Sequence, residues 1–190
     1  MQSAERDWHE HFQRFLTPEE ENRRQLFHEC AHAWIGLLHG AQITSFERVP
    51  GKTSCVRIAG IRTLEHHYEI GVAGLLAEAK AVMPPKHEAA PFAVGQMRPL
   101  AELIYREILP FKEDMDYAIH PHVPFASRPP IRMWGTLSVA DLEVPIQQGL
   151  SMAHLHDALE AVSERLGDRA EWRRFREYLA SIETHQASEI

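Results

Sequence analysis

The chain has 190 residues, of which 44% are hydrophobic and 25% are charged, and its formal net charge is −7 at pH 7. These values are typical of one globular domain and exclude a fibrous or wholly disordered chain. The negative charge argues against nucleic acid as a partner, and the longest apolar run, near 33–38, is too short to span a bilayer.

The N-terminal residues and the cysteines bear on the cellular compartment. Residues 1–12 carry charges and histidines where a signal peptide would have an apolar stretch. Only two cysteines are present, Cys30 and Cys55, which is fewer than a secreted domain of this size often has. We interpret both as reduced thiols and expect a cytoplasmic protein without a membrane segment.

The first predicted helix runs from residue 17 to residue 39. Thr17 can act as its N-cap, Pro18 suits the first helical position, and Glu20 completes a capping box. Apolar residues recur along it at helical spacing, and Gly40 is a typical stop. We therefore expect a helix that is buried on most of its surface.

A β-hairpin is predicted next. The β-prone runs 43–49 and 54–58 flank Pro50-Gly51-Lys52, which is a typical turn composition. A helix over 64–82 follows, and its small residues favour close packing against another helix.

Prolines divide the middle of the chain. Pro110 is predicted to separate a helix over 99–109 from a short one that begins near Lys112. Residues 121–145 are rich in proline and lack a clean period, so we expect an ordered surface loop that forms a cleft wall or lid.

A helical pair is predicted to close the chain at 151–182, with Gly167 between its two helices. The expected fold is a single α+β domain over 1–190, mostly helical, with one small β-hairpin. Its core is expected at about 17–120.

The motif that carries chemistry lies inside the first helix. Residues 28–32 read His28-Glu29-Cys30-Ala31-His32, an HExxH pattern. Side chains four residues apart share one helix face, so both imidazoles can bind one Zn²⁺ ion while Glu29 reaches the metal-bound water. Zinc makes that water acidic near neutral pH, and Glu29 can act as the catalytic base.

Several segments around this motif resemble one family in the correct order. Residues 26–38 resemble the HEAGHA helix in the peptidase domain of the FtsH-type ATP-dependent zinc proteases. Residues 43–51 look like the strand that follows it, and 74–78 are similar to the family's GRAAE helix. Asp114-Met115-Asp116-Tyr117-Ala118 resembles its DLERA segment.

The resemblance implies a zincin-like fold and a peptide or protein substrate. It also implies that Asp114 is the third zinc ligand, since the leading aspartate of DLERA has that role in the family. Asp116 is the near rival. Glu78 is a further alternative, as a ligand or as an outer partner of a ligand histidine.

The family's ATPase is not expected here. Gly51-Lys52-Thr53 looks like the end of a phosphate-binding loop, but such a loop needs a glycine where this chain has Phe46. The predicted function is thus a zinc metalloendopeptidase that works without ATP.

Two other hypotheses stay open. The chain can be a non-catalytic, peptidase-like binding or regulatory module whose zinc site is structural or lost. Alternatively, the motif is accidental in a helical interaction protein. The pairs His66-His67, His120/His122 and His154/His156 are interpreted as solvated surface rather than as metal ligands.

Overall fold

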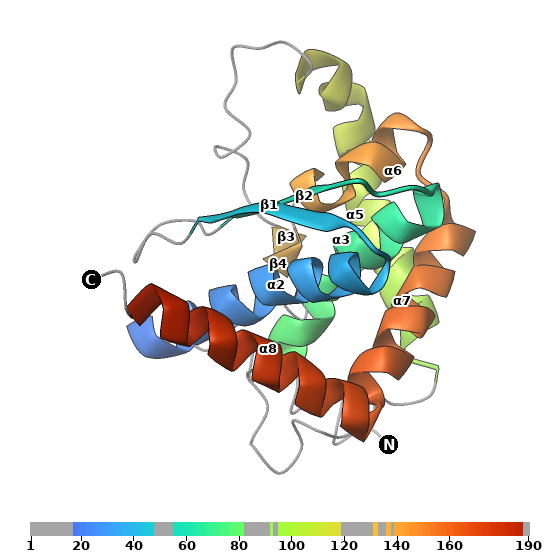
Figure 1. Ribbon diagram of the computed structural model, residues 1–190. Coiled ribbons are helices and arrows are strands. Elements are labelled where there is room, and N and C mark those ends of the chain that lie inside the picture. The colour runs from blue at the N-terminus through green and yellow to red at the C-terminus, as the bar shows by residue number, and fades with distance from the viewer. Residues whose placement is uncertain are drawn as a thin grey trace.

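The computed structural model describes residues 17–47, 55–81, 92, 95–118, 131–132, 136–137 and 139–187, with only the backbone of 109–118. Within these residues the fold is mostly helical, with a small antiparallel hairpin (Figure 1). The expected mostly helical α+β class is confirmed in that coarse form.

The helix that carries the HExxH residues is α2 (Pro18–Leu38). The hydroxyl of Thr17 accepts a hydrogen bond from the backbone N–H of Glu20, and the Glu20 carboxylate accepts one from the backbone N–H of Thr17. This is the predicted capping box. Gly40, just beyond the helix, has a φ of 74°, a conformation that glycine adopts without strain.

The hairpin consists of β1 (Gln42–Glu47) and β2 (Cys55–Ala59), which pair antiparallel with an irregularity between Ile43 and Ser45. The predicted turn at 50–52 lies outside the described residues. The hairpin packs on α2 at Gly36, where a Cβ would lie 3.2 Å from a methyl group of Ile58.

The central helix is α3 (Leu64–Ala81), and every residue from Ile70 to Ala81 is buried. It packs against α2 on one side and α7 (Met152–Gly167) on another. Such complete burial explains its many small residues, because close helix packing leaves little room for side chains. This position makes α3 the inner wall of the site described below.

The helix α5 (Met97–Ala118) corrects one prediction. It is a single helix that passes through Pro110, where two helices were expected. A proline inside a helix removes one backbone hydrogen bond, which normally ends or kinks the helix. Here the preceding turns are anchored in the core by Leu100, Ile104 and Ile108, and this packing outweighs the local cost.

The segment that was expected to be a surface loop over 121–145 contains regular structure in its described part. It forms β3 (Ile131–Arg132), β4 (Thr136–Leu137), the 3₁₀ helix η2 (Val139–Leu142) and the start of α6 (Glu143–Gln147). Pro145 fits in the first turn of α6, where backbone N–H groups have no partner within the helix. The prediction of a plain loop was therefore wrong for the described residues between 131 and 145, because β4, η2 and α6 pack onto α3.

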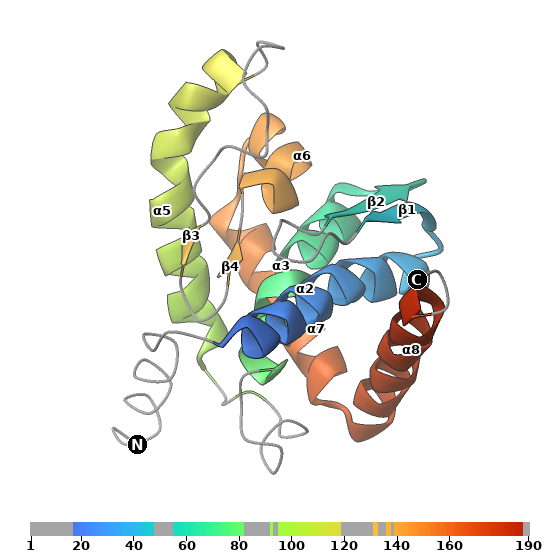
Figure 2. The same cartoon turned by 90° about the vertical axis from the view of Figure 1, so that its left-hand side faces the viewer.

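The last helices, α7 and α8 (Arg169–Ala187), confirm the predicted C-terminal pair. In Figure 2, α5 and α8 lie on opposite sides of the molecule with α2 and α3 between them. The rings of Trp172 and Phe175 in α8 pack on Phe27 of α2, with centroids 6.0 and 5.8 Å away. In the described part of the chain, no helix is long and apolar enough to cross a membrane.

Candidate metal centre

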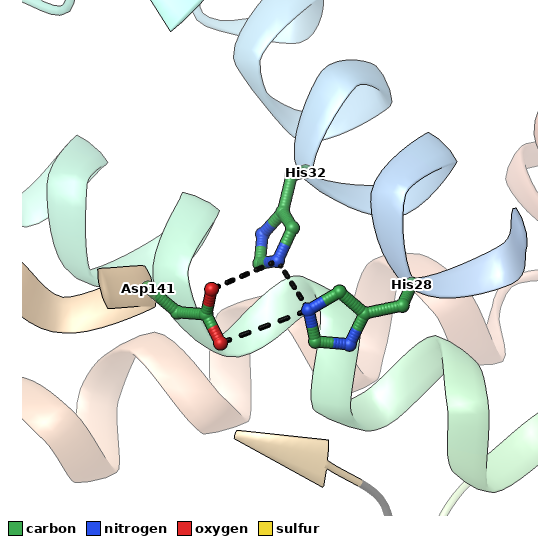
Figure 3. A group of neighbouring side chains, drawn as sticks. All are labelled: His28, His32 and Asp141. Carbon is green, nitrogen blue, oxygen red and sulfur yellow. Dashed lines mark hydrogen bonds and ion pairs between the residues drawn. The ribbon is translucent and has the colours of Figure 1, made fainter. Parts of the chain in front are cut away.

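Two histidines of α2 face the interior of the fold together. His28 and His32 lie one helical turn apart, and they are only 7% and 5% exposed. Their Nε2 atoms are 2.8 Å apart and share a hydrogen bond (Figure 3). Both predicted ligand histidines are thus brought to one point in the core.

Asp141 of η2 supplies a third group at the same point. Its Oδ1 lies 3.6 Å from Nε2 of His32, and its Oδ2 lies 3.6 Å from Nε2 of His28 (Figure 3). One ligand atom from each of the three side chains lies within 4.8 Å of the other two. Two imidazoles and a carboxylate form a donor set that catalytic metal ions use in proteins. This group can hold a metal ion.

The outer nitrogen of each imidazole also has a partner. Nδ1 of His32 donates to the backbone carbonyl of Ile70 at 2.6 Å, because a carbonyl oxygen can only accept. Nδ1 of His28 lies 2.9 Å from Oε1 of Glu78, an ion-pair contact that is off the ideal hydrogen-bond direction. Such outer partners fix the ring orientation and tautomer of metal-binding histidines. Both Nε2 atoms therefore point toward Asp141.

A proton lies between the two rings in the metal-free protein. With its Nδ1 protonated, His32 has only a lone pair at Nε2, so Nε2–H of His28 donates to it. Burial lowers the pKa of His28, but the charges of Glu78 and Asp141 outweigh it and raise that pKa well above its usual value. Burial and the charge of His28 lower the pKa of His32 to about 4. Accordingly, His28 is the charged ring and His32 the neutral one.

Glu29, the predicted base, is held against the hairpin. Its Oε2 accepts a hydrogen bond from the backbone N–H of Val56 in β2 at 2.9 Å. Burial raises the pKa of Glu29 to about 7, and the nearby carboxylate of Asp141 adds to the rise while the charge of His28 opposes it. A carboxylic acid with this pKa can both accept and release a proton near neutral pH.

Two glycines of α3 make room for the site. A Cβ on Gly74 would lie 2.6 Å from both Cε1 of His28 and Nε2 of His32. A Cβ on Gly71 would lie 2.2 Å from the backbone oxygen of Asp141. Real Cβ atoms essentially never come so close to other atoms. Gly71 therefore lets η2 approach α3, and Gly74 gives the imidazoles their space.

Glu78 and the two glycines form one functional face of α3. Positions 71, 74 and 78 are three and four residues apart, so they point in the same direction. Of the roles considered for Glu78, its contact with Nδ1 of His28 is that of an outer partner.

The third zinc ligand was predicted to be Asp114, with Asp116 as its rival. Both side chains lie outside the described residues, so this role stays a prediction. Asp141 was missed by the sequence reasoning. A signal for it exists, because Asp141-Leu142-Glu143 matches the first three residues of DLERA, which Asp114-Met115-Asp116 does not.

The chain matches no model of a known protein family, and comparison with curated proteins and with solved structures finds no match either. The function therefore has to be argued from the site itself.

Proposed function

We propose that this protein is a zinc metallopeptidase with a zincin-like site, in which His28, His32 and Asp141 hold the metal and Glu29 is the base. The observation that carries the proposal is the convergence of both Nε2 atoms and the Asp141 carboxylate, with each Nδ1 already engaged elsewhere. A structural zinc site usually has four protein ligands, whereas a catalytic site has three and an open position. Three ligands next to the half-buried carboxylic acid of Glu29 fit the catalytic kind.

The chemistry follows from where the side chains lie. Zinc bound there would make its water acidic near neutral pH and polarise a peptide carbonyl. The carboxylate of Glu29 takes a proton from the attacking water and returns it to the leaving amine. Its hydrogen bond from Val56 holds it between α2 and β2, while the backbone carbonyl of Ile70 and the carboxylate of Glu78 keep the two imidazoles oriented.

The hairpin supports a peptide as the substrate. Because the N–H of Val56 donates to Glu29, it points away from β1 and toward the site. In the described part of the chain, β1 is the only strand paired with β2. An extended peptide can add along such a strand edge through its main chain, which would place a peptide bond beside the metal.

The test compares wild type with Glu29→Gln. Both proteins should bind one zinc ion per chain, and only the wild type should cleave unfolded protein substrates such as casein. Loss of cleavage with retained zinc assigns Glu29 to the chemistry. Zinc in both proteins without cleavage by the wild type would favour the binding or regulatory module, and no zinc in either would favour an accidental motif.

A further inference from the structure

A buried carboxylate lies behind the metal centre. The side chain of Glu78 is 2% exposed, and each of its oxygens faces a different partner. Oε1 lies 2.9 Å from Nδ1 of His28, and Oε2 accepts a hydrogen bond from NH1 of Arg24 at 2.9 Å. An ionised carboxylate is tolerated in the interior only when such partners compensate for its lost hydration.

Arg24 is itself fixed in place from its own helix. It lies one turn before His28 on α2, and its side chain is 12% exposed. Its Nε donates to Oε2 of Glu21 at 2.9 Å, and its NH2 donates to the other oxygen of Glu21. A guanidinium presents its donors in a rigid fork, so this two-point contact determines where NH1 points. The remaining nitrogen is thereby aimed at α3 and Glu78.

The contact with Arg24 fixes the rotation of the Glu78 carboxylate. Because NH1 of Arg24 donates to Oε2, the other oxygen, Oε1, is left facing Nδ1 of His28. If Glu78 rotated, Oε1 would move away from Nδ1 of His28 and the ring would lose its orientation.

We infer that Arg24 is a positioning residue, which acts through Glu78 to aim Nε2 of His28 at the metal. This inference rests on the proposed zinc site but not on peptidase activity. It extends the support of the metal from one outer partner to a series of contacts that runs from Glu21 through Arg24 and Glu78 to His28. These contacts link successive turns of α2 by way of α3.

The test measures zinc affinity by competition with a chromogenic chelator, and the visible spectrum of the Co²⁺-substituted protein. We expect Arg24→Leu to weaken zinc binding by about 3- to 10-fold. This effect is at or below the lower end of the roughly 10- to 100-fold loss that follows removal of a direct outer partner. Arg24→Lys should recover part of that loss, because it keeps the charge but lacks the fork. The Co²⁺ bands should shift in Arg24→Leu. Arg23→Leu, a neighbouring control, should change neither readout.

A double-mutant cycle with Glu78→Gln shows whether Arg24 acts through Glu78. If it does, Arg24→Leu should have little further effect on zinc affinity in the Glu78→Gln background. Equal losses in both backgrounds, or an unchanged affinity and Co²⁺ spectrum in Arg24→Leu, would overturn the inference while leaving the zinc site intact. If Arg24→Leu does not fold, Arg24→Gln, which also removes the charge, takes its place, and wild-type zinc affinity in that variant would likewise overturn the inference. A wild type that binds no zinc would overturn both this inference and the proposed function.

Discussion

The two halves of the candidate metal centre are built in different ways. On α2, His28 and His32 are neighbours in the sequence, and helical geometry alone places them on one face. Asp141 comes from η2, far along the chain, and reaches the site only because η2 packs against α3 at Gly71. The histidine pair is thus a local feature and the aspartate a tertiary one. Sequence reasoning can find the first directly, while the second needs the fold.

The largest expected loss of zinc affinity comes from removing Asp141, the ligand that tertiary packing brings to the site. Asp141→Ala should weaken zinc binding by more than about 100-fold, since the loss of a ligand exceeds the 10- to 100-fold effect of losing an outer partner. Asp114→Ala is the matched control and should leave zinc affinity within about twofold. Chelator competition on both purified proteins measures the difference. The opposite ranking would restore Asp114 as the third ligand.

The glycines of α3 allow the histidine pair and Asp141 to be disturbed separately. Gly74→Ala puts a methyl group into the space of both imidazoles. Overpacking of this kind costs about 1–3 kcal/mol, and we expect about 10- to 100-fold weaker zinc binding. Gly71→Ala should also weaken it, but by pushing Asp141 away. Circular dichroism should show both variants folded, because alanine favours helix over glycine. Wild-type zinc affinity in Gly74→Ala would contradict the geometry described for α3.

The protonation states of His28 and His32 predict how zinc affinity depends on pH. Because the pKa of His28 is raised well above 6.5, zinc must displace a proton from it at neutral pH. The pKa of His32 is about 4, so His32 adds a second proton only in acid. Zinc affinity should therefore fall by about tenfold per pH unit as the pH decreases from 7 to 5. Calorimetry at pH 6.5 in buffers of different ionisation heat should detect at least about one proton released; none released would contradict the shared proton.

The smallest effect on the site should come from the helix cap. Thr17→Ala removes the hydroxyl that accepts from Glu20 and should lower the free energy of unfolding by about 1 kcal/mol. The cap is about three turns from His28, so zinc affinity should stay within about twofold. Denaturant unfolding of the metal-free protein and chelator competition measure the two quantities. A large loss of zinc affinity would mean that the start of α2 is coupled to the site.

The same division explains what the sequence could predict. The cap at Thr17, the helix over 64–82 and the placement of His28 and His32 depend on residues close in the chain, and all were predicted. Pro110 inside a helix and Asp141 beside the histidines depend on packing against distant elements, which periodicity does not record. The zinc identity, the base role of Glu29 and the peptide substrate stay predictions for the experiments above.

The hydrogen bond between His28 and His32 has a consequence for how the proposed site would gain and lose a metal ion. In zinc fingers the metal supplies the folding energy, and chelation leaves an unfolded chain. Here a proton already holds the two rings together, with Glu78 and Ile70 bracing them from outside. A metal ion bound at the proposed site would therefore replace this proton in a chain that is already folded. Chelation should leave a folded protein that can bind metal again, so metal supply and pH would control the site without unfolding.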